Sequence, residues 1–424
     1  MHWGHASSAD LVAWADHPIA LAPDERGTVY SGSAVVDAGD TAGLGPGALV
    51  VAFTRHRDGV EEQSLAWSTD GGETFTERAE PVLEAPPGQG DFRDPRLLRH
   101  PGDPRRWAML LAAGHAVWIY TSPDLVDWTR TGTVTGVFSE AGTWEMPDLL
   151  RFDVDGSDVW VLVVSIADGA PAGGSGVQAV AGTFDGSTFT PAGEPFWVDH
   201  GPDFYAPQAW TDAPDGRRIW VGWTANWHRV YALPAGDWRG QMSIPREVSL
   251  RAGDHGPRLV QEPVGELASY RERSLVASGG EVGEHLGSPL PVTAPALDVV
   301  LGLAPGATGE VRGRRGPAEV EVRVDREVVE VRVVDREAAP GSEGGSGEAR
   351  YRAPRPPADG LREVRVLLDT ASMEVFAGGA TISVLLPGSG EPWAVEVGPP
   401  GEGAGIDRIE VHALRAAGPA AGRA

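Results

Sequence analysis

Short apolar segments of strand length recur along the first 225 residues. Each is four to seven residues long, and turn-forming residues such as Gly, Pro and Asp separate them. Runs of this length, without the 3.6-residue period of an amphipathic helix, favour β-strands. The sequence therefore predicts an all-β first region, with strands at residues 49–54, 107–113, 117–120, 159–165 and 219–223.

The pattern changes in the second half of the chain. Residues 320–324 and 329–333 alternate strictly between valine and a charged residue around a short polar turn, as expected of a half-buried β-hairpin with a solvated face. Further strands are predicted at 364–368, 373–376, 382–386, 394–397 and 409–413, and a β-sandwich is the simplest arrangement for them. We therefore expect four parts: a first domain at 1–260, a linker at 261–273, a sandwich at 274–415 and a disordered tail at 416–424.

A repeat runs through the first domain. The segment from Ser8 to Trp14 matches the segment from Ser122 to Trp128, and looser copies surround the aspartates at positions 70 and 185. The four aspartates, at positions 10, 70, 124 and 185, are 60, 54 and 61 residues apart. Each copy predicts a hairpin corner, because Asp-containing steps form tight turns. A repeat of this length with several short strands indicates a β-propeller, whereas a sandwich with chance similarity does not explain the even spacing.

Equivalent positions of the repeat carry polar or aromatic groups. Counting 20 to 24 residues from each aspartate leads to Ser31, Asp94, Glu145 and Tyr205. In a propeller such positions meet at one end of the central channel, so these residues are predicted to line a single funnel. Two carboxylates in one site are the minimum for cleaving a glycosidic bond by acid–base chemistry.

The first repeat is incomplete. Enough residues for two strands lie before each of the later aspartates, at positions 70, 124 and 185, whereas only nine residues precede Asp10. The sequence therefore predicts a first blade without its inner strands, in a chain that begins inside a domain.

Composition narrows the partners and the chemistry. The net charge of −25 argues against nucleic acid and anionic membrane surfaces as partners, and no apolar run approaches the ~20 residues of a membrane span. The absence of cysteine excludes disulfides and thiolate chemistry. No signal-peptide pattern follows Met1, so the sequence does not indicate the protein's location. The 15 tryptophans suit both a β-rich core and stacking against sugar rings.

Six motifs together resemble glycoside hydrolase family 32, the fructan hydrolases that include levanases, exo-inulinases and invertases. The resemblance implies a five-bladed propeller followed by a β-sandwich. It also implies retaining hydrolysis of terminal β-fructosidic bonds in levan, inulin or sucrose, without a cofactor or a metal. The glycine-rich run at 173–178 is most similar to the levanase and exo-inulinase branch. The six motifs are Trp3-Gly4-His5-Ala6, Tyr30-Ser31-Gly32-Ser33, Phe92-Arg93-Asp94-Pro95, Trp144-Glu145-Met146-Pro147-Asp148-Leu149, Asp203-Phe204-Tyr205-Ala206 and Trp238-Arg239-Gly240.

The resemblance implies a role for each candidate residue. Glu145 matches the general acid/base, and Trp144 and Met146 are expected to shield its carboxyl from water, which favours proton donation. Asp94 matches the residue that binds fructosyl hydroxyls and stabilises the oxocarbenium-like transition state, with Arg93 as its cationic neighbour. The fructose pocket is expected to be walled by Trp3, Tyr30, Ser31, Tyr205 and Trp227.

Two departures from the family pattern matter. Met146 stands where the family usually has cysteine, a mild change because methionine is also apolar and polarisable. The family's nucleophile is an aspartate in a Trp-Met-Asn-Asp-Pro-Asn-Gly type segment upstream of the Trp-Gly-His-Ala motif, and this chain has no counterpart. We therefore expect an N-terminally truncated chain that does not turn over substrate. The alternatives are a non-catalytic fructan-binding propeller and a sucrose-preferring invertase, and the DNA upstream of Met1 distinguishes truncation from the first of these.

Overall fold

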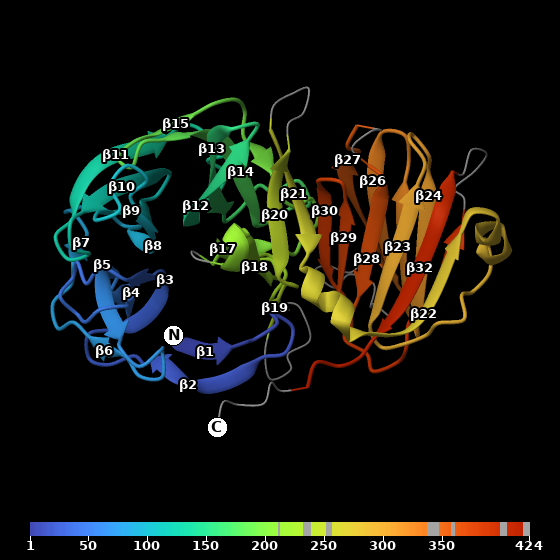
Figure 1. The fold of residues 1–424 in the computed structure, drawn as a ribbon, viewed down its shortest axis with the longest axis horizontal. Helices are drawn as coiled ribbons and strands as arrows, with labels where there is room; N and C mark the ends of the chain where they lie inside the picture. Colours follow the sequence, from blue (N-terminus) through green and yellow to red (C-terminus); the bar gives the residue numbers. More distant parts are fainter. Residues whose placement is uncertain are drawn as a thin grey trace.

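A computed structural model of the chain describes residues 1–210, 213–231, 239–251, 257–336, 347–357, 361–398 and 405–418. A ring of sheets around a central channel lies beside a pair of packed sheets (Figure 1). Of the tail predicted to be disordered, residues 419–424 lie outside the described residues. Within the described ranges, no helix has the length and apolar character that crossing a membrane requires.

The ring contains five antiparallel sheets among the described residues, which confirms the predicted five-bladed propeller. The first blade has two strands, as predicted, and the others have four or five. The blades are, in order, β1 (Trp3–Ser7) and β2 (Ala15–Leu21); β3 (Thr28–Asp37), β4 (Ala48–Arg57), β5 (Val60–Ser68), β6 (Thr76–Glu77) and β7 (Leu83–Glu84); β8 (Arg93–Arg99), β9 (Trp107–Ala112), β10 (Ala116–Ser122) and β11 (Thr129–Thr135); β12 (Trp144–Val154), β13 (Ser157–Ile166), β14 (Gly176–Phe184), β15 (Phe189–Pro191) and β16 (Phe196–Trp197); and β17 (Tyr205–Ala209), β18 (Ile219–Thr224), β19 (Gln241–Met242), β20 (Arg246–Arg251) and β21 (Arg258–Pro263), with the 3-10 turn η1 (Pro214–Gly216) before β18.

The repeated aspartates form the hairpin corners that the sequence predicts. Asp10 joins β1 to β2, and Asp124 joins β10 to β11. In both, the Oδ1 atom accepts hydrogen bonds from the backbone N–H groups two and three residues ahead, at 2.8–3.0 Å. The following residues, Leu11 and Leu125, have positive φ values of 61° and 65°. The carboxylate thus replaces a backbone acceptor in a tight turn, which is why aspartate is repeated there.

Buried polar contacts join the inner strands of neighbouring blades. The Ser33 hydroxyl on β3 donates to the Pro95 carbonyl on β8 at 2.7 Å. Arg96 on β8 forms an ion pair of 2.7 Å with Asp148 on β12, whose other carboxylate oxygen accepts from the Ala209 N–H on β17 at 2.8 Å. Arg96 and Asp148 are both buried, so these contacts hold the inner strands in a fixed register from blade to blade.

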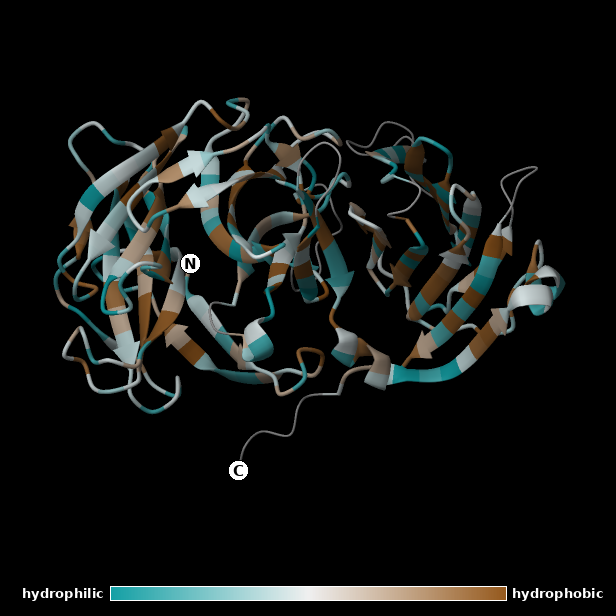
Figure 2. Cartoon of the chain, turned by 45° about the horizontal axis from the view of Figure 1, so that its top comes forward, coloured by the Kyte–Doolittle hydropathy of each residue, from teal (hydrophilic) through white to brown (hydrophobic). Residues whose placement is uncertain are grey.

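The second part is a β-sandwich, as predicted. Valines at alternate positions of its strands face the core between the sheets, and the intervening charged residues face outward, so brown and teal bands alternate along the strands (Figure 2). One sheet has the order β22-β32-β23-β28-β29-β30 and the other β27-β26-β25-β24-β31. The strands are β22 (Arg271–Ser278), β23 (Leu297–Leu303), β24 (Gly309–Arg315), β25 (Ala318–Val324), β26 (Val328–Asp335), β27 (Glu348–Pro354), β28 (Glu363–Leu368), β29 (Ser372–Ala377), β30 (Ala380–Leu385), β31 (Ala394–Gly398) and β32 (Ile406–Leu414), with η3 (Gly279–His285) after β22.

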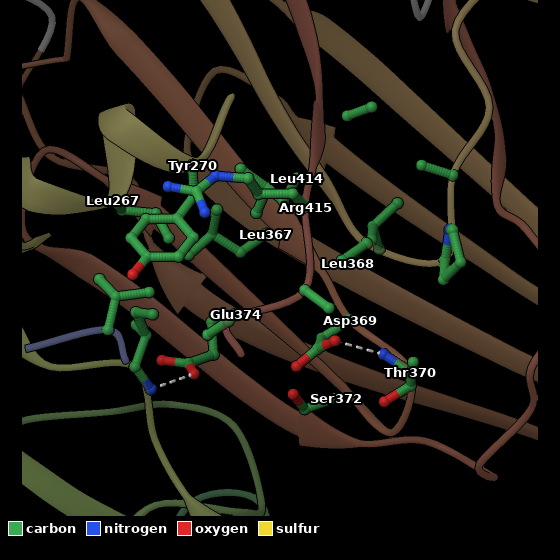
Figure 3. A pocket seen from close by; sticks show the side chains of 18 of the residues that line it. Leu267, Tyr270, Leu367, Leu368, Asp369, Thr370, Ser372, Glu374, Leu414 and Arg415 are labelled. Atoms are coloured by element: carbon green, nitrogen blue, oxygen red, sulfur yellow. Dashed lines mark hydrogen bonds between the residues drawn. The ribbon is translucent and has the colours of Figure 1, made fainter. Parts of the chain in front are cut away.

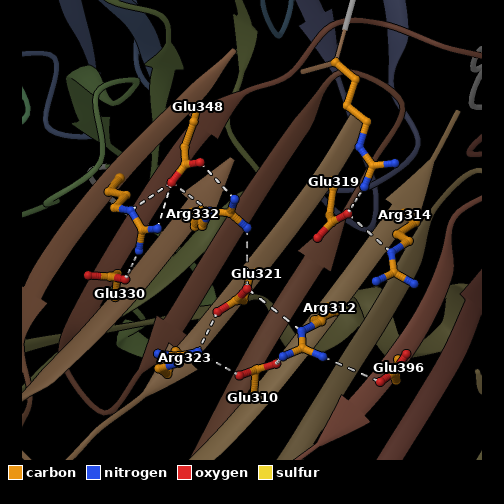
Figure 4. A network of polar contacts seen from close by, with 12 residues as sticks. Glu310, Arg312, Arg314, Glu319, Glu321, Arg323, Glu330, Arg332, Glu348 and Glu396 are labelled. Atoms are coloured by element: carbon orange, nitrogen blue, oxygen red, sulfur yellow. Dashed lines mark hydrogen bonds and ion pairs between the residues drawn. The ribbon is translucent and has the colours of Figure 1, made fainter. Parts of the chain in front are cut away.

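The outer face of the five-stranded sheet carries a lattice of Arg–Glu ion pairs (Figure 4). Arg323 on β25 pairs with Glu310 on β24 at 3.3 Å, and Arg332 on β26 pairs with Glu348 on β27 at 2.8 Å. Opposite charges lie on neighbouring strands, where cross-strand pairs stabilise a sheet. This arrangement agrees with the solvated face that the alternating sequence predicts.

The propeller and the sandwich share a buried junction. The chain passes from β21 to β22 through η2 (Gly265–Tyr270), inside the predicted linker, and the Tyr270 hydroxyl donates to Asp10 of the first blade at 2.7 Å. Arg246 of β20 is fully buried and donates to Glu374 of β29 at 2.7 and 3.0 Å. A cavity of about 680 Å³ lies at this junction (Figure 3), but neither Asp94 nor Glu145 lines it.

Candidate active site

A β-bulge interrupts the inner strand of each four- or five-stranded blade near its start. The bulged strand has one residue more than its partner, which re-aims the neighbouring side chains. Because the four strands are equivalent in the ring, the four bulges lie at the same end of the channel. The bulges fall between Val29 and Gly32 on β3, Arg93 and Arg96 on β8, Glu145 and Asp148 on β12, and Tyr205 and Gln208 on β17.

The bulges correct the alignment obtained by counting. Asp94, Met146 and Ala206 occupy the same position of the bulge and have positive φ values of 62°, 49° and 52°. Asp94 is thus equivalent to Met146, and Glu145 is equivalent to Arg93, one position away from the predicted match. The prediction of a common end of the channel is unaffected, because Asp94 lies within one bulge and Glu145 lies next to another. The positive φ values of Asp94, Met146 and Ala206 place them in the left-handed backbone region. This conformation is strained for residues other than glycine and is often found at functional sites.

Asp94 is buried against the start of the neighbouring blade. One carboxylate oxygen accepts a hydrogen bond from the Met146 N–H at 2.9 Å, and the residue is 6% exposed. The pKa of Asp94 is raised to about 7, chiefly by burial; the Met146 N–H and the Arg93 guanidinium lower it, and the nearby carboxylates of Glu145 and Glu61 raise it. Asp94 is therefore an acid whose protonation changes near neutral pH.

Glu145 is held by two donors on different blades. One carboxylate oxygen accepts from Arg93 at 3.1 Å and the other from the Tyr205 hydroxyl at 2.5 Å. The side chain keeps 22% of its surface exposed, so it remains open to the channel. Tyr205 is buried, and burial together with the Glu145 charge holds its pKa well above the usual value, so it acts as a hydrogen-bond donor. Its ring meets Trp227 edge-on, with centroids 6.5 Å apart.

Three buried residues of the second blade, which the sequence analysis missed, fix the backbone before Asp94. Glu61 accepts from the Phe92 N–H at 2.7 Å and from the Arg93 Nε at 2.9 Å. Gln63 donates to the Phe92 carbonyl at 2.6 Å and accepts from Thr54 at 2.8 Å. All three are at most 3% exposed. Their signal in the sequence is two polar residues, at positions 61 and 63, on the core-facing side of a strand, where apolar residues are the rule.

One cation serves several acids at this end of the channel. The Arg93 guanidinium contacts Glu61 at 2.8 Å, Asp91 at 2.5 Å and Glu145 at 3.1 Å. With Asp94 adjacent, four carboxyl groups surround a single guanidinium, an excess of negative charge that favours keeping one proton. Among the described residues, no cluster of three or more His, Asp or Glu side chains could hold a metal ion.

The remaining predicted wall residues lie on the first two blades. The Trp3 indole N–H donates to the Tyr30 carbonyl at 2.8 Å, and the Tyr30 ring stacks on His56 with centroids 4.8 Å apart. Tyr30 and Ser31 are the two bulged residues of β3. Trp227 is 42% exposed. The structure thus joins Arg93, Asp94, Glu145, Tyr205 and Trp227 through direct contacts, while Trp3, Tyr30 and Ser31 lie at the same end of the neighbouring blades.

Comparison with known proteins identifies relatives with this architecture. The chain is 36% identical to a levanase of Bacillus subtilis over 98% of its own length and 64% of that protein. It is 33% identical to an extracellular exo-inulinase of Aspergillus niger over 62% of its length and 56% of the relative. The chain therefore spans less than two thirds of these relatives. A crystal structure of an exo-inulinase from Aspergillus awamori superimposes with a TM-score of 0.83 at 26% identity, covering 98% of this chain and 90% of that one.

The family model described as "Glycosyl hydrolases family 32 N-terminal domain" matches residues 1–263, more than half of the chain. This range comprises the propeller with its paired carboxylates. Together with the levanase similarity over almost the full chain, the match shows that the protein belongs to glycoside hydrolase family 32.

Proposed function

We propose that this chain binds the terminal β-fructosyl unit of fructans such as levan and inulin, and of sucrose. It provides the general acid/base and the transition-state stabiliser of a retaining β-fructosidase, but not the nucleophile. The observation that carries the proposal is the joining of Asp94 and Glu145 at one end of the channel. Asp94 accepts from the N–H of the residue after Glu145, and Arg93 contacts Glu145. The relatives named levanase, exo-inulinase and invertase supply the substrate class.

In this proposal Glu145 is the general acid/base. A retaining glycosidase protonates the leaving oxygen with one carboxyl group while a second forms a covalent glycosyl intermediate. Arg93 and Tyr205 fix both oxygens of Glu145, so the carboxyl has one orientation toward the channel. Protonated Glu145 donates to the oxygen between fructose and the departing sugar, and it later accepts a proton from the water that attacks the intermediate.

Asp94 is assigned to the fructosyl hydroxyls. Its buried carboxylate stabilises the positive charge that develops on the sugar ring when the glycosidic bond breaks, and the low polarity around it strengthens this effect. Trp3, Tyr30, Ser31 and Trp227 complete the proposed pocket. Fructose binding stabilises the crowded carboxylates, because the sugar hydroxyls donate hydrogen bonds to them.

The proposal assigns no nucleophile within residues 1–424. A retaining nucleophile must stand roughly 5–5.5 Å from the acid/base, across the scissile bond. Among the residues that the structure describes, the other acids that contact Arg93 are Glu61 and Asp91; both bind that guanidinium, and Glu61 is 3% exposed. We therefore propose that the 424-residue chain binds fructosides without hydrolysing them.

The test combines binding with turnover. Isothermal titration at pH 8, where Asp94 is ionised, should show binding of fructose and inulin oligosaccharides, and Asp94→Asn should weaken it by roughly 10- to 100-fold, because a charged hydrogen-bond acceptor is lost. Fructose release from sucrose, inulin and levan should not exceed a blank. Absence of binding by the folded wild-type chain would refute the proposal. Glu145-dependent fructose release would confirm the substrate class and show that another carboxylate is the nucleophile.

A further inference from the structure

Strand β30 forms the edge of the six-stranded sandwich sheet, and the loop that leads into β17 lies along it. The His200 N–H donates to the Thr381 carbonyl at 2.8 Å, and the Asp203 N–H donates to the Ser383 carbonyl at 3.2 Å. Loop residues 199–203 therefore bind the free side of the sandwich sheet much as an additional strand would.

Two aspartates of the loop complete this pairing. The Ser383 N–H donates to Asp199 at 3.0 Å, and the Leu385 N–H donates to Asp203 at 2.8 Å. The carboxylates thus accept from the two backbone N–H groups that a neighbouring strand's carbonyls would otherwise satisfy. Both aspartates are buried, and the Ser383 hydroxyl adds a bond of 2.6 Å to Asp199.

The approach of the two backbones requires a glycine. A Cβ atom at Gly201 would lie 2.2 Å from the Ser383 carbonyl oxygen and 2.4 Å from its nitrogen, and both contacts are with backbone atoms. Alanine at position 201 therefore forces the loop away from β30. The loop ends two residues before Tyr205, the donor to Glu145.

A second contact ties Trp227 to the same loop. Asn226 donates to the Pro202 carbonyl at 2.7 Å, and Arg229 lies 3.5 Å from Asp203. Arg229 also donates to the hydroxyl of Tyr351, on β27 of the other sandwich sheet, at 3.1 Å. Both sheets of the sandwich therefore reach the segments that carry Tyr205 and Trp227.

We propose that the sandwich is a positioning element of the fructosyl site: β30 and Tyr351 set the place of Tyr205 and Trp227, and through Tyr205 the orientation of Glu145. The inference rests on the proposed function for its ligand. It goes further by giving the second part of the chain a role in substrate binding rather than in stability alone.

Two variants of the full chain test this role, and one serves as control. Tyr351→Phe removes one hydroxyl in the sandwich, and Gly201→Ala moves the loop. Gly265→Ala is the control, because a Cβ there meets nothing within 4 Å. Affinity for inulin oligosaccharides, measured well below the melting temperature, should fall roughly 3- to 10-fold for Tyr351→Phe and more than about tenfold for Gly201→Ala, and should not change for Gly265→Ala.

Hydrogen exchange gives a readout that needs no ligand. Peptides covering 203–209 and 226–230 should exchange faster in both variants, whereas β8 should be unaffected, because its contacts do not involve the loop. If Gly201→Ala fails to fold, the affinity and the hydrogen exchange of Tyr351→Phe alone test the proposal. Wild-type affinity and exchange in every variant that folds would overturn the proposal, even if melting temperatures fell. If the wild-type chain binds no fructoside, the proposed function fails, and the exchange data alone decide whether the sandwich positions these residues.

Discussion

Replacing Asp94 by asparagine should stabilise the protein at neutral pH, although it weakens the proposed site. Asparagine has nearly the same shape, and its amide oxygen can still accept from the Met146 N–H, which is 2.9 Å from the carboxylate. Its NH₂ group faces the neighbouring carboxylates as a donor. The substitution therefore removes a buried negative charge and keeps the packing.

The magnitude follows from the pKa of Asp94. Burial raises it from 3.8 to about 7, so between these values the folded state holds a proton that the unfolded chain has released. The free energy of unfolding therefore falls as pH rises through this window, by about 1.4 kcal/mol per pH unit, or about 4 kcal/mol at most. Below about pH 4 both states are protonated and the term is absent. Because asparagine does not ionise, the variant escapes the loss, and we expect it to be about 2–4 kcal/mol more stable at pH 8.

Urea unfolding of both proteins between pH 4 and pH 8.5 measures this difference. The stabilities should be similar at pH 4 and should diverge as pH rises, with a melting temperature about 4–8 °C higher for Asp94→Asn at pH 8. Asp16→Asn, at an exposed position, is the matched control and should show no such divergence. A variant that is no more stable than wild type at pH 8, or a difference independent of pH, would refute the electrostatic account of Asp94.

Three further predictions follow from named contacts. Arg246→Met should lower the free energy of unfolding in urea by roughly 3–5 kcal/mol, because it leaves two buried carboxylates without their cation. Arg151→Ala breaks an equally close but exposed pair and should lower it by less than about 1 kcal/mol. Equal losses in the two variants would contradict the dependence on burial. In a Glu61→Gln background the stability gained from Asp94→Asn at pH 8 should shrink, because one negative charge that raises the pKa of Asp94 is gone; an undiminished gain would exclude that coupling. Glu145→Gln should keep fructose affinity within about threefold, because the proposal assigns Glu145 to proton transfer and not to the fructosyl hydroxyls; an affinity loss as large as that of Asp94→Asn would remove Glu145 from its role.

The sequence predicts those parts of the fold that depend on local chemistry. The corner aspartates are detectable because a carboxylate accepting two nearby N–H groups is a local device, repeated with each blade. Counting from them places Asp94 and Glu145 at one end of the channel but misaligns them by one position. A bulge adds a residue to a strand without a signature that a fixed interval detects. Only the ladder pairing around Asp94 and Met146 shows which residues are equivalent.

Contacts between distant segments could not be predicted in this way. Glu61 and Gln63 look like ordinary polar residues of a strand until the structure shows that they face Phe92 rather than solvent. The loop at 199–203 pairs with β30 more than 180 residues later. Nothing in either segment specifies the other, because backbone pairing depends on shape and on free N–H and C=O groups rather than on side-chain identity.

The repeated bulge also bears on how such a domain diversifies. The same backbone feature presents a tyrosine and a serine on β3, an aspartate on β8, a methionine after the acid on β12 and an alanine on β17. A duplicated blade therefore arrives with a place for a reactive group already formed and facing the channel. Point substitutions at that place are enough to exchange an acid, a phenol or an apolar side chain, and the scaffold needs no insertion or deletion. Different chemistries can thus arise on one ring while its inner strands stay in register.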